Sequence, residues 1–131
     1  GFPVLLQPYF GSVDTEGEPT LVSFDGRYSH AIRKGRMLHK GHAPSARPTP
    51  PTIHACVATD DERLVADMIL ARLPFPAPLL YARIDLVRDR AGEPHVLELE
   101  LTEPTLFLRH DPEAADRFAA RILARATRSR S

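Results

Sequence analysis

The 131-residue sequence predicts an α+β domain in which two helices pack against a mostly antiparallel sheet. Three features predict this fold: segments with the apolar–polar alternation of strands, two segments with apolar residues at helical spacing, and turn residues between them. Apolar residues make up 43% and charged residues 26%, both ordinary for a folded protein. A single Cys excludes an internal disulfide framework and a Cys-based zinc site.

The charges balance, with 17 Lys and Arg residues against 17 Asp and Glu residues. A nucleic-acid-binding domain normally has a basic excess, so we expect no nucleic-acid partner. No apolar run approaches the roughly 18–20 residues that cross a bilayer, so we expect no membrane partner. Without disulfides or a secretory signal, we expect a cytoplasmic location. The chain opens at Gly1 on an apolar run, and we interpret it as a piece of a longer protein.

The first part of the chain is expected to form three strands and a long loop. Residues 4–8 are apolar, like a short buried strand. Residues 21–24 and 28–34 flank Asp25-Gly26, a pair typical of a tight hairpin turn. Residues 35–58 contain four Pro and three His without any periodicity, so we expect a loop that is functional or mobile.

A helix and a second hairpin are expected next. Thr59 and Glu62 fit a capping box, and the helix that they open should end near Leu73, because three Pro residues follow. Residues 79–88 and 95–102 alternate like two strands around a turn.

The last helix is expected to begin with Asp111 as its N-cap and Pro112 at the first helical position. Residues 128–131 are expected to form a disordered tail. The helix has one apolar stripe, which we expect to be core, formed by Ala115, Phe118, Ala119, Ile122, Leu123 and Ala126.

The second hairpin collects charged residues on one face. Because side chains alternate along a strand, Arg83 shares a face with Asp85, and Glu98 shares a face with Glu100. A two-residue turn at Ala91-Gly92 then pairs Asp85 with Glu98 and Arg83 with Glu100. The opposite face is aliphatic, with the expected pairs Ile84–Leu99 and Leu86–Leu97.

Three carboxylates around one guanidinium repel one another unless something else neutralises them. Oxygen donors suit a hard cation such as Mg²⁺, and no His or Cys lies on this face to favour a softer metal. Arg83 beside that ion could bind a transferring phosphoryl group, because its planar fork matches phosphate oxygens. The alternative is an ordinary hairpin whose charged face meets solvent, with Arg83 and Glu100 forming a weak surface pair.

Three short patterns in this hairpin resemble the metal-binding segment of the ATP-grasp carboxylate–amine ligases, especially the prokaryotic glutathione synthetase-like group. They are Arg83-x-Asp85, Glu98-x-Glu100 and Thr102-x-Pro104. Ligases of this superfamily from D-cycloserine biosynthesis are also similar here. Glu100 stands where the family usually has Asn, so the site would hold three anionic ligands instead of two.

The resemblance extends to the amino-terminal segments and implies roles for their residues. Residues 4–10 resemble the strand that faces adenine, and residues 17–26 resemble the stretch in which an acid meets the ribose. The implied nucleotide-binding residues are Gln7, Pro8, Tyr9, Phe10, Glu18 and Leu97, with Glu16 as the alternative to Glu18. The other implied roles are metal binding by Asp85, Glu98 and Glu100, catalysis by Arg83, and binding of phosphate or substrate carboxylate by Arg33 and Lys34.

The resemblance implies that residues 1–127 are the C-terminal half of an ATP-grasp fold in a longer enzyme. That enzyme would use ATP and Mg²⁺, or Mn²⁺, to join a small-molecule carboxylate and an amine through an acyl phosphate, forming a C–N bond. The fragment alone would be inactive, and the intact enzyme would be a homo-oligomer. The alternative is a degenerate, non-catalytic nucleotide-binding module.

The remaining polar residues have structural interpretations. His30 is expected to be a partly buried structural residue, and Cys56 a small core residue. His39, His42 and His54 match no metal-ligand spacing.

Overall fold

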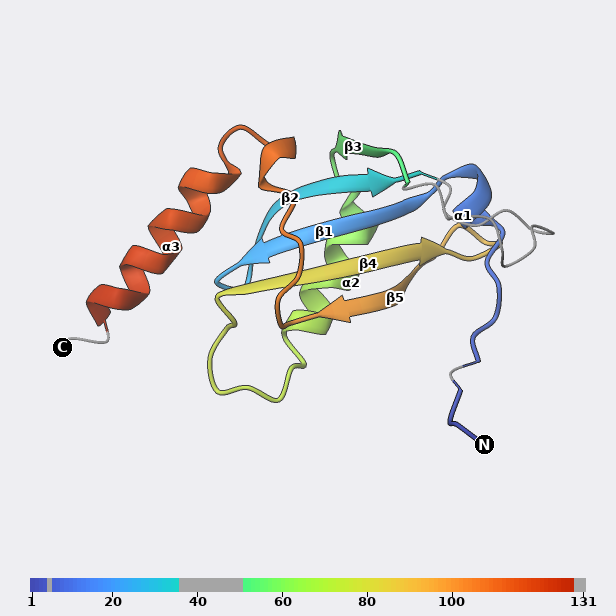
Figure 1. Cartoon of the computed structure of the whole chain (residues 1–131), viewed down its shortest axis with the longest axis horizontal. Coiled ribbons are helices and arrows are strands. Elements are labelled where there is room, and N and C mark those ends of the chain that lie inside the picture. Colours follow the sequence, from blue (N-terminus) through green and yellow to red (C-terminus); the bar gives the residue numbers. More distant parts are fainter. Residues whose placement is uncertain (5, 36–50, 129–131) are drawn as a thin grey trace.

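The computed structural model describes residues 1–4, 6–35 and 51–128 of the chain. Its elements form one five-stranded antiparallel sheet with the strand order β3-β2-β1-β4-β5, so β1 is central (Figure 1). The α+β fold class expected from the sequence is confirmed. The elements are α1 (Ser12–Thr15), β1 (Glu18–Phe24), β2 (Arg27–Lys34), β3 (Ile53–Cys56), α2 (Asp60–Leu70), β4 (Tyr81–Arg88), β5 (Pro94–Glu100), the 3-10 helix η1 (Leu108–His110) and α3 (Ala114–Arg128).

The β1–β2 hairpin forms as the sequence predicts. Its turn residues, Asp25 and Gly26, both have left-handed backbones, with φ of 54° and 73°. This is the conformation that two-residue hairpin turns require, which explains the Asp-Gly pair. The Gly26 position is also crowded, because a Cβ there would lie 2.9 Å from a side-chain carbon of Pro78.

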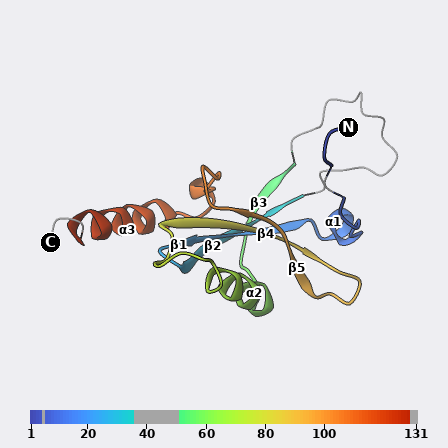
Figure 2. The same ribbon diagram turned by 90° about the horizontal axis from the view of Figure 1, so that it is seen from below.

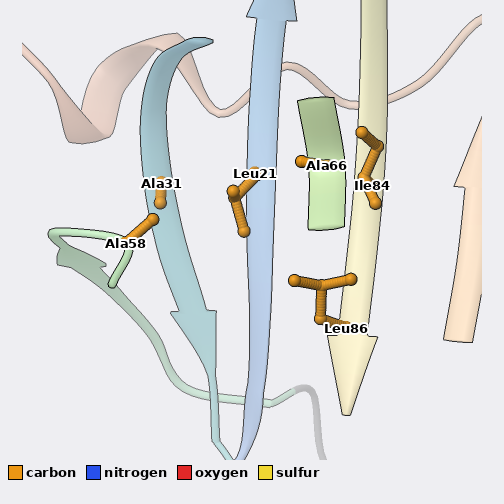
Figure 3. Close-up of a cluster of buried hydrophobic side chains, with 6 residues drawn as sticks. All are labelled: Leu21, Ala31, Ala58, Ala66, Ile84 and Leu86. Atoms are coloured by element: carbon orange, nitrogen blue, oxygen red, sulfur yellow. The ribbon is translucent and has the colours of Figure 1, made fainter. Parts of the chain in front are cut away.

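Helix α2 covers one face of the sheet and builds the core with it (Figure 2). Its capping box is present, and the Thr59 N–H donates to Glu62 Oε2 at 3.0 Å. The helix ends at Leu70, three residues before the expected end. The core cluster, shown in Figure 3, consists of Leu21, Ala31, Ala58, Ala66, Ile84 and Leu86.

The other face of the sheet is crossed by the segment between β5 and η1. In Figure 1 this segment runs in front of the strands, and in Figure 2 it lies on the side away from α2. It contains Phe107, whose ring lies 5.9 Å from the guanidinium carbon of Arg83. The two faces therefore differ: one is packed on a helix, and the other carries the charged residues.

Two sequence expectations about strands are wrong. The described residues of the segment 4–8 form no strand, and Val4 and Leu6 are 85% and 92% exposed, because this segment pairs with no strand of the sheet. Within residues 35–58, expected to be a loop, β3 pairs with β2. Residues 36–50, with His39 and His42, lie outside the described residues.

Helix α3 uses a different face from the expected one. Phe118 stacks on Phe24 with ring centroids 4.7 Å apart, but Ile122 and Leu123 are 43% and 66% exposed. Two arginines connect the helix to the β1–β2 hairpin instead: Arg117 donates to Ser29, and Arg125 donates to Asp25. The apolar stripe was expected to be core, and it is largely exposed because these polar contacts set the rotation of the helix.

The expected disordered tail lies mostly outside the described residues, which end with Arg128 as the last residue of α3. Within the residues that the structure describes, no helix combines the length and apolar character needed to span a membrane.

Candidate active site

The charged residues of the second hairpin meet on the face of the sheet opposite α2. The register pairs Arg83 with Glu100 and Asp85 with Glu98, as the sequence predicts. From β1 and β2, Glu18 and Lys34 reach the same place. We call this group the carboxylate cluster: Glu18, Asp85, Glu98 and Glu100, with the cations Arg83 and Lys34.

The pairing of β4 with β5 agrees with the prediction at the cluster, but nearer the turn it differs from the prediction by one residue. The Asp89 N–H donates to the Glu93 carbonyl at 3.0 Å, so the loop has three residues instead of the expected two. A bulge between Asp85 and Leu86 compensates for this extra residue, and Leu86 pairs with Val96 instead of Leu97. The expected Leu86–Leu97 pair is therefore wrong, because Leu97 is the residue at the bulge.

Arg83 holds three carboxylates together. It is 7% exposed, and its Nε and Nη2 atoms donate to the two oxygens of Asp85 at 3.1 and 3.0 Å. The same Nη2 donates to Glu98 Oε2 at 3.2 Å and to Glu100 Oε1. Carboxylates from two strands thus converge on one guanidinium nitrogen, which offsets part of their repulsion.

Lys34 provides the second cation of the cluster. Its Nζ lies 2.5 Å from Asp85 Oδ2 and 3.9 Å from Glu18 Oε2. Burial raises the pKa of Glu18, and Lys34 opposes this effect while the neighbouring Asp85 adds to it. A metal ion was expected to supply the positive charge that the carboxylates need, and in the structure Lys34 supplies one such charge.

The donor chemistry of the cluster fits a hard cation. When ionised, its four carboxylates outnumber the two cations by two charges, and every donor is oxygen. Thr20, which pairs with Asp85, has a buried hydroxyl without a hydrogen-bond partner among the described residues. In the described ranges, however, no three His, Cys, Asp or Glu side chains are already arranged around a metal position. Oxygens of Glu98 and Glu100 would have to turn from Arg83 to bind one.

The segment that crosses this face is fixed by His30. The Leu106 carbonyl can only accept, so His30 Nε2, 2.9 Å away, carries the proton. Nδ1 then accepts from the Ser29 hydroxyl at 3.0 Å, and that hydroxyl accepts from Arg117 at 3.1 Å. Burial lowers the pKa of His30, which favours the neutral ring. These contacts give His30 a structural role.

Arg33 does not join the carboxylate cluster. Its guanidinium lies on the α2 side, 3.5 Å from Glu62 Oε1, and it donates to the Glu16 carbonyl at 3.2 Å. It also lines a cavity of about 500 Å³ with His54 and Cys56. The structure therefore separates Arg33 from Lys34, although the two were expected to share one binding role.

The expected nucleotide-binding residues are only partly brought together. Glu18 lies in the cluster, whereas Gln7 and Pro8 are exposed in a segment outside the sheet. Phe10 stacks on His95 of β5 with centroids 5.9 Å apart. Tyr9 donates from its hydroxyl to Asp14 Oδ2 at 2.5 Å.

Sequence reasoning missed two polar residues near this region. Thr20 shares its face with Glu18, and the alternation along β1 could have found it. Glu62 was identified only as part of a helix cap, yet it is fully buried between two arginines. No local pattern in the sequence indicates that burial.

A second cavity, of about 630 Å³, lies on the α2 side of the sheet. Its walls come from the β1–β2 turn, from the end of α2 and from the loop before β4, and they include Tyr28, Arg63 and Phe75. None of the residues of the carboxylate cluster lines it, so it is separate from the candidate site.

Comparisons with known proteins agree with the fold. No protein-family model matches the sequence. The chain is 45% identical to the cycloserine biosynthesis protein DcsG of Streptomyces lavendulae over 132 aligned positions, which cover 95% of this chain and 43% of that protein. The crystal structure of D-cycloserine synthetase DcsG matches with a TM-score of 0.79 and 44% identity over 91% of this chain and 41% of that chain.

A more distant match concerns the fold alone. D-alanine–D-alanine ligase from Bacillus anthracis, in complex with ATP, aligns with a TM-score of 0.55 and 20% identity. The alignment covers 86% of this chain and 40% of that chain. The present chain thus spans less than half the length of each of these relatives.

Proposed function

Because this chain belongs to the ATP-grasp superfamily, we propose that residues 1–127 are the C-terminal half of the ATP-grasp domain of an ATP-dependent carboxylate–amine ligase. One observation carries the proposal: Asp85, Glu98 and Glu100 converge on Arg83 in a fold shared with D-cycloserine synthetase. The complete enzyme would form a C–N bond, with a small-molecule carboxylate and an amine as substrates. We also propose a cytoplasmic, homo-oligomeric enzyme.

The cluster would hold the metal ions that accompany the nucleotide. Glu98 accepts from Arg83 through Oε2 and Glu100 through Oε1, and on turning from Arg83 both carboxylates would offer oxygens beside Asp85, which is paired with Lys34. Asp85, Glu98 and Glu100 would hold Mg²⁺, or Mn²⁺ in its place, which would supply positive charge against that of the ATP phosphates. Because Lys34 Nζ lies 2.5 Å from Asp85 Oδ2, the ammonium would have to leave that carboxylate for Asp85 to hold a metal ion.

The reaction proposed for the complete enzyme has two steps. An oxygen of the substrate carboxylate attacks the γ-phosphorus of ATP, the bond to the β-phosphate oxygen breaks, and ADP leaves. The amine then attacks the carbonyl carbon of the acyl phosphate, loses a proton, and phosphate leaves with the electrons of the C–O bond. Arg83 would stabilise the charge on the transferring phosphoryl group and on the tetrahedral oxyanion.

Three further residues of this chain would bind and orient the reactants. Lys34 would move from Asp85 to a phosphate oxygen or to the substrate carboxylate. Glu18 would accept hydrogen bonds from the ribose hydroxyls, and Phe10 would provide an apolar surface for the base. Because Arg33 lies on the other face, we assign it no contact with phosphate.

A second candidate function is a degenerate module that binds a nucleotide without catalysis. Two observations favour it: Glu100 replaces the usual Asn, and the described residues contain no ready-made metal arrangement. The two functions differ in one respect that can be tested. The ligase would turn over ATP and would need Asp85 and Glu98 to do so, whereas the degenerate module would bind a nucleotide without turnover.

The test uses the full-length protein that contains this chain. Asp85→Asn and Glu98→Gln remove one charge each, and Asp116→Asn and Glu93→Gln are matched controls at exposed positions. Calorimetric titration with MgATP should show a dissociation constant at least about tenfold higher for the two cluster variants and unchanged for the controls. Failure of the wild type to bind MgATP, or equal binding by Asp85→Asn, would contradict the proposal. ADP release that persists in both variants would exclude the catalytic function.

A further inference from the structure

The two faces of the sheet carry bridges between the same two strands. On the cluster face, Lys34 of β2 meets Asp85 of β4 at 2.5 Å. On the helix face, Glu62 of α2 lies 3.5 Å from Arg33 of β2 and 3.1 Å from Arg88 of β4. Since β1 lies between β2 and β4, each bridge passes over the central strand.

Glu62 is the centre of the bridge on the helix face. Its side chain is fully buried, and it accepts from the Thr59 N–H at 3.0 Å and from Arg88 Nη2 at 3.1 Å. A buried carboxylate is costly unless it is paired and hydrogen-bonded, so these contacts fix where Glu62 lies. The arginines are fixed in turn, because Arg33 also donates to the Glu16 carbonyl and Arg88 also donates to Asp61.

The position of Arg33 determines that of Lys34. Neighbouring side chains of a strand point to opposite faces, so drawing Arg33 toward α2 directs Lys34 toward Asp85. The backbone is also constrained here, because a Cβ at Gly17 would lie only 2.2 Å from the Lys34 carbonyl oxygen. This end of β2 has little freedom to twist without moving the Lys34 ammonium.

We propose that Glu62 is a positioning residue for the carboxylate cluster. It acts through Arg33 and Arg88 to hold β2 and β4 at the spacing at which Lys34 meets Asp85. If Asp85 is to hold a metal ion, the helix-face bridge would keep β2 and β4 in place while the Lys34 ammonium leaves that carboxylate. The metal part of this inference rests on the proposed function, whereas the placement of Lys34 does not.

The experiment changes residues of the bridge on the helix face and measures the carboxylate cluster on the opposite face. In the full-length protein, Glu62→Gln removes the buried charge, and Arg33→Gln removes its partner at a position that is 30% exposed. Lysine ammonium protons are visible by ¹H–¹⁵N NMR when an ion pair protects them from exchange. The second readout is the affinity for Mn²⁺–ADP. Asp25→Asn, which breaks the pair with Arg125 at the other end of β1, is the control for a general loss of stability.

We expect Glu62→Gln and Arg33→Gln each to abolish the Lys34 ammonium signal and to weaken Mn²⁺–ADP binding about tenfold, as outer-shell substitutions do. The double variant should be no worse than either single variant, because both changes break one bridge. Asp25→Asn should leave both readouts unchanged. If the Glu62 variant does not fold, Arg33→Gln alone gives the answer.

The inference is overturned if Arg33→Gln, or a folded Glu62→Gln, keeps the Lys34 signal and the wild-type affinity while the protein loses stability. In that case Glu62 only joins the helix to the sheet. If the wild type binds no Mn²⁺–ADP but the Lys34 signal still depends on Glu62, the proposed nucleotide function fails and the positioning role stands.

Discussion

Arg33 and Lys34 are neighbours in β2, yet their side chains bind carboxylates on opposite faces of the sheet. Lys34 meets Asp85 in the carboxylate cluster, and Arg33 meets Glu62 beneath α2. A substitution at one position therefore tests a different part of the protein from a substitution at the other.

Lys34→Met should destabilise the protein and make it more dependent on metal. The ion pair is largely buried, with 11% exposure for Lys34 and 2% for Asp85. Because Arg83 still contacts Asp85, we expect a loss of about 2 kcal/mol, less than for an uncompensated buried charge. Urea denaturation with and without Mg²⁺ measures this, and Mg²⁺ should stabilise the variant more than the wild type.

Arg63→Met is the control. It removes an exposed pair with Asp60 and should cost at most about 1 kcal/mol. Equal losses in the two variants would refute the prediction.

Gly17→Ala should be much more harmful than Gly92→Ala. Both glycines have left-handed backbones, with φ of 74° and 85°. Only at Gly17 would the new Cβ collide with the chain, 2.2 Å from the Lys34 carbonyl oxygen, and Gly92 has open space. We expect losses of about 3 kcal/mol or more at Gly17 and about 1 kcal/mol at Gly92, measured by urea denaturation. Similar losses of stability for both variants would contradict the prediction and show that the β2 backbone at Lys34 shifts to make room for the new Cβ.

The stability of the protein should fall as the pH drops below the ordinary pKa of histidine. Burial lowers the pKa of His30 from 6.5, and Arg117 and His110 add to this shift, while the hydrogen bond to the Leu106 carbonyl and the charge of Asp111 oppose it. The unfolded state therefore binds a proton first, and stability is lost as the pH falls through about 6.5 toward the folded-state pKa. Above that range His30 contributes no pH dependence.

Urea midpoints measured from about pH 8 to about pH 5 should show this slope in the wild type. His30→Gln, which can still donate to the Leu106 carbonyl, should flatten it. His95→Gln serves as the control at an exposed histidine and should retain the slope. A slope that survives in His30→Gln would assign the effect to another group.

The route of the phosphoryl group can be followed with ¹⁸O in the substrate carboxylate. If the complete enzyme forms an acyl phosphate, one labelled oxygen should appear in the inorganic phosphate released with ADP. Label in AMP, with release of pyrophosphate, would instead indicate an acyl adenylate and would contradict the proposed mechanism. Mass spectrometry of the phosphate and the nucleotide distinguishes the two outcomes.

Much of the second hairpin could be predicted from the sequence. The alternation in β4 and β5 placed Arg83 and Asp85 on one face, and the pairs with Glu100 and Glu98 are confirmed. The turn was one residue too short in that prediction, and a bulge at Leu97 restored the register. The alternation along one strand shows which side chains share a face. It does not reveal a bulge, because a bulge depends on how two strands pair and leaves no mark in the residue types of either strand.

The apolar stripe of α3 shows the opposite case. Helical spacing predicted Ile122 and Leu123 as core, and they are exposed. The rotation of α3 is set by Phe118 on Phe24 and by Arg125 on Asp25. The hydrogen bond from Arg125 also lowers the pKa of Asp25. Periodicity finds the most apolar face of a helix, whereas docking depends on the partners that the rest of the fold presents.

By itself, the sequence determined the elements that depend on neighbouring residues: the Asp25-Gly26 turn, the capping box of α2 and the charged face of the second hairpin. Only the tertiary structure decided which distant charges meet, above all Lys34 with Asp85 and Glu62 with Arg33. The reason is physical. Turns, caps and alternation follow from backbone geometry over a few residues, whereas these contacts join strands that are separated by β1 and a helix on the far face. Their partners are fixed by how the strands pair and by which face α2 covers.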